Sequence, residues 1–207
     1  MTNVLIVEDS KISRDAMERR LSEEPGFQVI TAIGNAANAE IACMRGNVDL
    51  ILMDICTEDD ESGLKAAKRI KQHYPQIKII IMTSMPEHSF IRKALECGCD
   101  SFWYKEYGSV ELMEVCRRTM DGESVWPKTI PTLKIGLADS TDFTERELEV
   151  IRELVVGHKY SEIAEHLQIT ENTVKFHIKN IMSKTDFKNT LQLVAEVVEK
   201  RLILPRY

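Results

Sequence analysis

Short apolar runs rich in valine and isoleucine recur through the first 120 residues and alternate with stretches whose apolar positions are three or four residues apart. The runs predict buried strands, and the wider spacing predicts amphipathic helices. The predicted strands are residues 3–8, 27–32, 49–54, 78–83 and 101–105. The predicted helices lie near residues 11–22, 36–45, 63–73, 87–97 and 109–120. Five repeats of strand and helix predict an α/β fold with a doubly wound, five-stranded parallel sheet covered on both faces.

From Thr144 onward the pattern changes to helices alone. Thr144 and Glu147 have the spacing of a capping box, and Gly157 predicts the end of that first helix. The other expected helices are a second one with Ile163, Ala164 and Leu167, a third over about 171–184, and a fourth from Thr190 to about Arg201 with Leu191, Val194, Val197 and Val198 inward. Four helices with a tight turn before the third predict a small all-α helix-turn-helix module.

The two patterns divide the chain into domains. We expect a first domain over residues 1–120 and a second over residues 143–207. Residues 121–142 between them contain two prolines, two glycines and little periodicity. This composition is typical of a linker, which we expect Trp126 to pin in part.

The candidate chemistry lies where predicted strands end. Asp54 ends the third strand, at the edge where ligands of an open α/β sheet collect. Glu8 and Asp9 follow the first strand, Thr83 ends the fourth, and Lys105 ends the fifth. Two acids for a hard cation, an aspartate nucleophile, a hydroxyl and a lysine form a set suited to phosphoryl transfer.

By these residues and the intervals between them, the first 120 residues resemble a receiver domain of response regulators, which has a flavodoxin-like (CheY-like) fold. The resemblance implies that a sensor histidine kinase phosphorylates Asp54. It also implies that Glu8, Asp9 and Asp54 hold Mg²⁺ together with the backbone carbonyl of Cys56. A carbonyl comes from any residue type, so the cysteine at this position does not remove that ligand.

The same resemblance assigns a switch. Lys105 pairs with a phosphoryl oxygen, the Thr83 hydroxyl bonds another, and Phe102 is the aromatic residue that reorients with that hydroxyl. One segment departs from the family: residues 58–61 are four successive acids, where the family has a turn with proline and glycine. These acids would either repel an incoming phosphoryl group or attract additional cation.

The net charge of −6 is unevenly distributed, which bears on nucleic-acid binding. Residues 1–120 hold 15 basic and 19 acidic side chains, whereas residues 141–207 hold 10 and 11. DNA binding by the second half therefore requires a local basic face. Residues 170–189 provide one, because they contain four lysines against two acids.

The predicted third helix has two different faces. Val174, Ile178 and Ile181 are three or four residues apart and should face the core. Lys175 and Lys179 are four apart and should point together away from it. The sequence thus predicts a lysine-bearing surface on this helix.

The second half also resembles a known module. Residues 143–147, Gly157, residues 162–164 and residues 173–181 look like the signature of LuxR-type helix-turn-helix domains. The resemblance implies that the third helix enters the major groove of double-stranded DNA and that the fourth makes dimer contacts. It implies base and backbone contacts by Lys175, Phe176 and Lys179, and phosphate or capping contacts by Thr173 and Asn180.

Three further lysines complete the predicted DNA contacts. Lys159 stands where the family often starts the second helix with serine or threonine, so it weakens a cap and offers a phosphate contact. Lys184 and Lys188 come later in the chain and are expected to contribute at most phosphate contacts.

Cysteine usage and hydropathy indicate the compartment. Five cysteines lie within the first 116 residues without the spacing of a disulfide framework, which favours free thiols in a reducing cytoplasm. No apolar stretch approaches the roughly 18 residues of a membrane span. An export signal is also lacking at the N-terminus. We expect a cytoplasmic protein without membrane association.

Together the two halves resemble the NarL/FixJ family of response regulators. The resemblance implies a transcriptional regulator rather than an enzyme, which dimerises on promoter DNA when phosphorylated and has RNA polymerase as a further partner. Three alternatives stay open: a DNA-binding regulator whose receiver works independently of phosphorylation, a phosphohydrolase with Asp54 as nucleophile, and a protein-binding adaptor. The hydrolase would need a second acid at the position of Cys56, and the adaptor leaves the lysine-bearing helix without a role.

Overall fold

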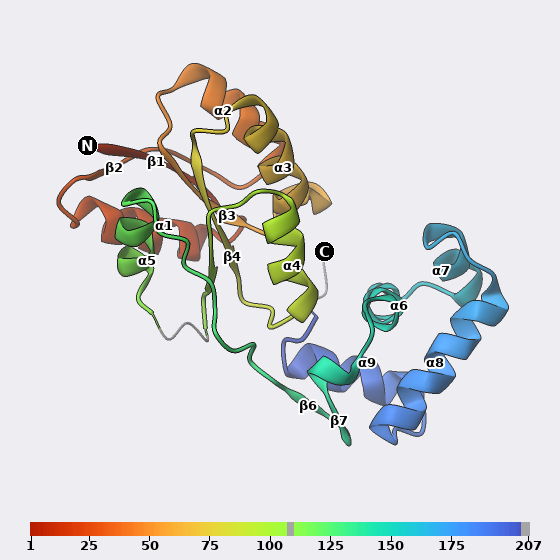
Figure 1. The fold of residues 1–207 in the computed structure, drawn as a ribbon. Coiled ribbons are helices and arrows are strands. Elements are labelled where there is room, and N and C mark those ends of the chain that lie inside the picture. The colour runs from red at the N-terminus through yellow and green to blue at the C-terminus, as the bar shows by residue number, and fades with distance from the viewer. Residues whose placement is uncertain (107–109, 204–207) are drawn as a thin grey trace. The chain divides into compact units, whose positions relative to one another are not determined.

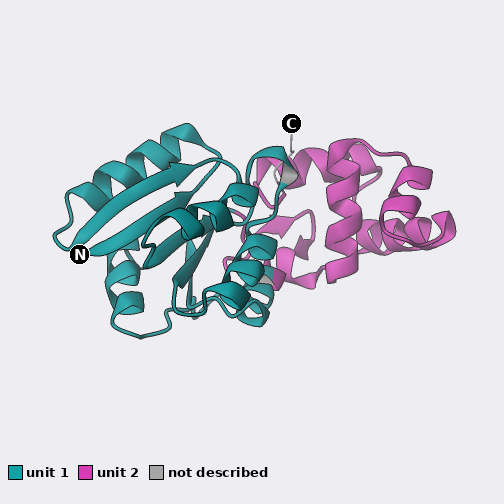
Figure 2. Ribbon diagram, turned by 90° about the horizontal axis from the view of Figure 1, so that it is seen from above, with its two compact units in different colours: residues 1–84, 90–129 teal, residues 85–89, 130–207 magenta. Residues whose placement is uncertain are grey.

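The computed structural model describes residues 1–106 and 110–203, which form two compact units (Figures 1 and 2). The first unit consists of residues 1–84 and 90–129. The second consists of residues 85–89 and of the chain from residue 130 onward. Each unit has a core of its own.

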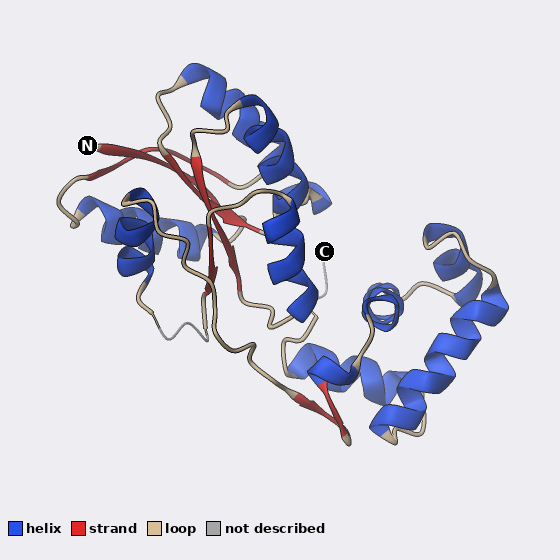
Figure 3. Cartoon of the chain, in the orientation of Figure 1, coloured by secondary structure: helices blue, strands red, loops and turns tan. Residues whose placement is uncertain are grey.

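The first unit is built on one parallel sheet (Figure 3). Its strands are β1 (Thr2–Val7), β2 (Phe27–Ile33), β3 (Leu50–Asp54), β4 (Lys78–Thr83) and β5 (Ser101–Tyr104). Their order, β2-β1-β3-β4-β5, confirms the predicted doubly wound α/β fold. The strand order reverses at β1 and β3, so a crevice for ligands is expected outside the carboxyl ends of these two strands.

Helices cover both faces of this sheet (Figure 3). They are α1 (Lys11–Ser22), α2 (Ala39–Arg45), α3 (Gly63–His73), α4 (His88–Glu96) and α5 (Leu112–Met120), with short 3₁₀ turns η1 (Ala36–Asn38) and η2 (Glu58–Asp60). Alternate residues of the strands join α1 and α5 in one apolar cluster, as the two-residue period of a strand requires. The predicted start of the last helix, Ser109, lies outside the described residues.

Helix α1 buries one face and exposes an apolar residue on another. Ser10 is its N-cap, as its position before the helix indicated, and accepts the backbone N–H of Ser13. Met17 and Leu21 are buried on the inner face. Ile12, another apolar residue of this helix, is 84% exposed, because it lies about 140° around the helix from Met17 and about 180° from Leu21.

The second unit is mainly helical. Its helices are α6 (Glu145–Val156), α7 (Tyr160–His166), α8 (Glu171–Thr185) and α9 (Thr190–Glu199), preceded by a 3₁₀ turn η3 (Ser140–Asp142). The predicted capping box is present: Thr144 Oγ1 accepts the N–H of Glu147, and the Glu147 carboxylate accepts the N–H of Thr144 at 2.7 Å. Gly157 ends α6 in the left-handed conformation, with φ of 96°.

A small hairpin lies within the residues predicted as a linker without regular structure. Its strands, β6 (Lys134–Ile135) and β7 (Ala138–Asp139), are antiparallel and only two residues long, too short to produce a periodic pattern. At the turn Gly136 has φ of +59°, and a Cβ there would lie 2.2 Å from the carbonyl oxygen of Thr185. Glycine is therefore required for the hairpin to approach the end of α8 this closely.

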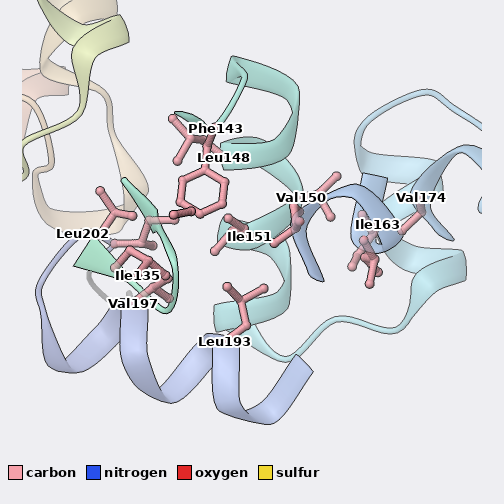
Figure 4. Packing of buried hydrophobic residues seen from close by; sticks show 14 of the residues in the cluster. Ile135, Phe143, Leu148, Val150, Ile151, Ile163, Val174, Leu193, Val197 and Leu202 are labelled. Carbon is pink, nitrogen blue, oxygen red and sulfur yellow. The ribbon is translucent and has the colours of Figure 1, made fainter. Parts of the chain in front are cut away.

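The hairpin and the helices share one core (Figure 4). Its central residues are Ile135, Phe143, Leu148, Val150, Ile151, Ile163, Val174, Leu193 and Val197. The prediction that Leu191 points inward is wrong, since this side chain is 76% exposed. Leu193 and Val197 form the inner stripe of α9, and Leu191 lies about 200° around the helix from Leu193.

Candidate functional site

The proposed receiver site is built where β1 and β3 end. These strands pair in parallel with Val7 beside Met53, so Glu8 and Asp54 leave the sheet next to each other. Both are almost fully buried, while Asp9 is exposed. Carboxylate oxygens of all three residues lie within 4.8 Å of one another. The structure thus brings together the three predicted metal-binding acids.

Lys105 connects two of these acids. It follows β5 and is held there by its backbone N–H, which donates to the Thr83 carbonyl at 2.9 Å. Its Nζ lies 2.8 Å from Oδ2 of Asp54 and 2.5 Å from Oε2 of Glu8. One ammonium group therefore partly compensates two buried carboxylates, which alone would repel each other.

Burial sets the protonation behaviour of this cluster. It raises the pKa of Asp54 to about 7, against the attraction of Lys105 and with a smaller contribution from the Glu8 charge. Burial also raises the pKa of Glu8, again opposed by Lys105. For Lys105, burial lowers the pKa, but attraction by the two carboxylates outweighs it and the net shift is upward. A bound cation would favour the ionised carboxylates.

Thr83 lies on β4, the neighbour of β3, and Phe102 lies on β5, the next strand of the sheet. Thr83 is buried at the end of β4, at the same edge as Asp54. Phe102 is buried on β5, and its ring centroid is 4.9 Å from that of Tyr104 and 6.4 Å from that of Trp126. The packing of Phe102 against Trp126 accords with the expectation that the tryptophan pins the chain after α5.

Arg14 is a residue that the sequence reasoning missed. From the first turns of α1 its guanidinium donates to the backbone carbonyl of Glu8 and to that of Asp9, the latter at 3.2 Å. It thereby positions the turn that carries both acids. The signal available in the sequence was an arginine one helical turn into the segment that follows the acid pair.

The acidic loop after Asp54 is tied to its neighbours. Cys56 and Ser62 form an isolated antiparallel bridge across its base. The buried Thr57 hydroxyl accepts the N–H of Ala36 at 3.0 Å and donates to the Glu61 carbonyl at 2.7 Å. Asp59 accepts a hydrogen bond from Asn35 Nδ2 at 2.9 Å. The loop is thus anchored to the segment that follows β2.

The second candidate surface is the outer face of α8. Val174, Ile178 and Ile181 are buried, as predicted. Lys175, Phe176 and Lys179 are exposed, and Phe176 keeps 60% of its surface accessible. Exposed aromatic and basic side chains on one helical face are suited to contact with nucleic acid.

The remaining predicted contacts fall into distinct settings. Thr173 is half-buried and belongs to the N-terminal cap of α8, where its N–H donates to Thr170 Oγ1 at 3.2 Å. Asn180 is also half-buried on α8. Lys159 is exposed at the start of α7, and its backbone N–H donates to Glu162 at 2.6 Å. Lys188 is exposed beyond the end of α8.

Lys184 is placed differently from the other lysines. Its Nζ lies 2.6 Å from Oε2 of Glu147 and 2.8 Å from the Asp142 carbonyl oxygen. The Glu147 side chain is only 3% exposed, so Lys184 compensates a buried charge. Its ammonium is engaged inside the unit, and we leave Lys184 out of the proposed DNA-contacting surface.

None of the helices in the described residues is long and apolar enough to cross a membrane.

Two family patterns match the chain. The one described as the response regulator receiver domain covers residues 4–117, and the one described as bacterial regulatory proteins of the luxR family covers residues 141–197.

Similar proteins match this chain over nearly its whole length. The response regulator protein VraR of Staphylococcus epidermidis is 31% identical over 205 residues, 97% of this chain and 98% of VraR. Among solved structures, the RcsB response regulator of Salmonella typhimurium is 18% identical, with a TM-score of 0.56 and coverage of 94% of this chain and 96% of RcsB. A structure of two RcsB dimers bound to two parallel DNAs gives 18% identity, a TM-score of 0.58 and coverage of 95% and 97%.

The two solved structures support the fold, and the sequence matches define the family. The chain belongs to the NarL/FixJ family of two-component response regulators, transcriptional regulators that join a receiver domain to a LuxR-type DNA-binding domain.

Proposed function

We propose that a sensor histidine kinase phosphorylates this response regulator on Asp54 with Mg²⁺, and that phosphorylation promotes dimerisation and sequence-specific binding to promoter DNA. The observation that carries the proposal is the cluster of the buried Asp54 and Glu8 with the partly buried Lys105, completed by the exposed Asp9. This set contains an acceptor, metal ligands and a counter-charge at one edge of the sheet. Regulation of transcription at a promoter also makes RNA polymerase a partner and the cytoplasm the compartment.

The donor set fits magnesium. Three carboxylates within 4.8 Å of one another supply the hard oxygen ligands that Mg²⁺ takes in proteins. Glu8, Asp9 and Asp54 would hold the ion, with the backbone carbonyl of Cys56 as a further ligand. When bound, the ion neutralises charge on the transferred phosphoryl group.

The protein's own residues then carry the transfer. A carboxylate oxygen of Asp54 attacks the phosphorus of the kinase phosphohistidine, so an O–P bond forms, the P–N bond breaks and the imidazole leaves. Lys105, already 2.8 Å from Asp54, is positioned to pair with a phosphoryl oxygen. The Thr83 hydroxyl at the neighbouring strand end bonds another, and Phe102 reorients with it. The added charge of roughly −1.5 to −2 biases the unit toward its active state.

The output is assigned to the second unit. Lys175, Phe176 and Lys179 on the exposed face of α8 contact base edges and backbone in the major groove. Lys159 and Lys188 add contacts to phosphates, and Thr173 and Asn180 add phosphate or capping contacts. RcsB dimers have been solved on DNA, which supports a dimer on paired half-sites here. Leu191, exposed on α9, is available for the contact between protomers.

A mobility-shift titration with and without a small-molecule phosphodonor tests this function. We expect the donor to tighten binding of the wild-type chain to its promoter and to leave Asp54→Asn unchanged, since the amide keeps the shape but cannot accept a phosphoryl group. Equal binding with and without the donor, in a wild-type chain shown to be labelled, would support the alternative regulator that works independently of phosphorylation. Stoichiometric labelling of Asp54→Asn would move the acceptor elsewhere.

A further inference from the structure

The DNA-binding unit contains a cluster of two histidines and a glutamate that the proposed function does not use. Glu153 lies in the last turn of α6, and His158 follows Gly157, the residue that ends this helix. His166 is the last residue of α7. The left-handed turn at Gly157 brings the chain back, so that the backbone N–H of His158 donates to the Glu153 carbonyl at 3.1 Å. The cluster thus joins the ends of two helices.

The potential ligand atoms converge on one point. Nδ1 of His158 and Nδ1 of His166 each lie 2.8 Å from the same oxygen, Oε2 of Glu153. The ring centroids are 4.6 Å apart with an interplanar angle of 83°, so the two imidazoles approach the carboxylate from different directions. All the ligand atoms lie within 4.8 Å of one another.

We propose that Glu153, His158 and His166 bind a Zn²⁺ ion that connects the end of α6 to the end of α7. Two imidazole nitrogens and one carboxylate oxygen are a zinc donor set, with water in the fourth position of a tetrahedron. Tetrahedral zinc distances separate neighbouring ligand atoms by about 3.3 Å, so the 2.8 Å contacts need to open by only about 0.5 Å.

Accessibility and chemistry distinguish this site from the receiver pocket. The side chains of Glu153, His158 and His166 are 21%, 31% and 47% exposed, so an ion can enter and a water ligand has room. The receiver pocket offers oxygen ligands alone, which suit Mg²⁺, whereas imidazoles select ions of the zinc type. The hydrogen bond that His166 donates to Glu153 raises the pKa of His166, so zinc competes with a proton for this ligand.

Zinc at this point would support the helix-turn-helix. His166 ends α7, and the turn after it leads directly into α8. An ion that bridges the ends of α6 and α7 would fix α7, the helix that precedes α8 in the helix-turn-helix. Because the ion binds the folded unit and not the unfolded chain, it also raises thermal stability.

Isothermal titration of the full chain with Zn²⁺ in excess Mg²⁺ tests the site, since Mg²⁺ occupies the oxygen ligands of the receiver pocket. We expect one strong zinc site per chain. His158→Gln, His166→Gln and Glu153→Gln should each weaken it roughly 10–100-fold or more, because even outer-shell partners of metal ligands have effects of that size. The matched control is His73→Gln, since His73 lies in the other unit, where it contacts Glu40 at 2.5 Å and no second histidine among the described residues joins the pair, and its replacement should leave zinc binding unchanged.

Two further measurements keep the result interpretable. Circular dichroism shows whether each variant folds, and Zn²⁺ should raise the Tm of the wild-type chain but not that of the folded His158→Gln variant. The absorption spectrum of the Co²⁺-substituted chain should lack the intense near-ultraviolet band of a thiolate ligand. Equal zinc affinity in folded variants and wild type, or a thiolate band from the cysteines, would overturn the proposal.

Discussion

The Nζ atom of Lys105 lies 2.8 Å from Oδ2 of Asp54 and 2.5 Å from Oε2 of Glu8, so one ammonium group holds both buried acids. This cation is in place before any phosphoryl group arrives. The pocket is therefore arranged in advance for an anion on Asp54. The ammonium group of Lys105 can compensate the charge of a phosphoryl group there without moving in from elsewhere.

Replacing Lys105 with glutamate should abolish most of the phosphodonor effect on DNA binding while basal DNA binding remains. The reason is that the phosphorylated Asp54 then lacks its counter-charge and meets a like charge instead. Mobility-shift titrations with and without donor measure both quantities. Lys65→Glu, an exposed lysine on α3, is the matched control and should keep the donor effect. Parallel loss of basal and stimulated binding would indicate misfolding of the chain.

Neutralising residues 58–61 should change Mg²⁺ affinity and the rate of labelling little. Asp59 is engaged by Asn35, and Glu58 and Asp59 are exposed, where water screens their field. Equilibrium titration with Mg²⁺ at low and moderate salt measures the effect. A marked fall in Mg²⁺ affinity, together with a flatter salt dependence, would show that the acidic loop adds to the field at the site.

Lys175→Ala and Lys179→Ala should each weaken promoter binding without unfolding the second unit, because both side chains point away from its core. Loss of a lysine that contacts a base edge should weaken the binding free energy by roughly 1–3 kcal/mol at one base position. Loss of a lysine that contacts only phosphate should weaken binding to all sequences alike and lower the slope of log affinity against log salt by about 0.9. Binding of the double variant at wild-type affinity would remove α8 from the interface and favour the adaptor alternative.

Lys184→Ala should lower stability rather than change DNA recognition. Its removal leaves the buried Glu147 carboxylate without its 2.6 Å partner, at a cost of about 1–3 kcal/mol. Thermal unfolding measures the loss, and Lys188→Ala, an exposed lysine nearby, should unfold like the wild type. A reduced salt slope of DNA binding in Lys184→Ala, with unchanged Tm, would return this lysine to the DNA-contacting set.

Acid should remove a contribution to stability made by Asp100. Burial alone would raise the pKa of this carboxyl, but hydrogen bonds from Lys71, the N–H of Ile79 and Lys78 outweigh it and the pKa is lowered. The ionised form is therefore favoured by folding, so the stabilisation is present above the unfolded value near 3.8 and is lost as the pH falls through the lower folded value. Unfolding curves of wild type and Asp100→Asn should converge as the pH drops through this range.

The sequence predicted the elements well where apolar periodicity extends over several residues. All five parallel strands and the helices of both units lie close to their expected positions. Two apolar residues near helix starts, Ile12 and Leu191, are exposed because they are out of phase with the buried positions of their helices. Ile12 lies about 140° around α1 from Met17, and Leu191 lies about 200° around α9 from Leu193. The β6–β7 hairpin was missed because two residues cannot show a period.

The candidate site was predictable for a different reason. The carboxyl ends of parallel strands meet at one edge, so residues at strand ends could be assigned to one pocket from order alone. What the sequence could not give were contacts between side chains from distant segments. Glu147 and Lys184 are 37 residues apart, and nothing in their local patterns indicated the ion pair that removes Lys184 from the surface. Arg14, Glu153 and the two histidines were missed in the same way.

Gly63, the first residue of α3, packs directly against the backbone of Asp54. A Cβ at this position would lie 1.8 Å from the backbone carbonyl oxygen of Asp54, and the N–H of Gly63 donates to the Ile55 carbonyl at 2.9 Å. No other amino acid fits without moving the strand end. The backbone of Asp54 and the first residue of α3 are therefore in direct contact, so a displacement of the Asp54 backbone also displaces that helix.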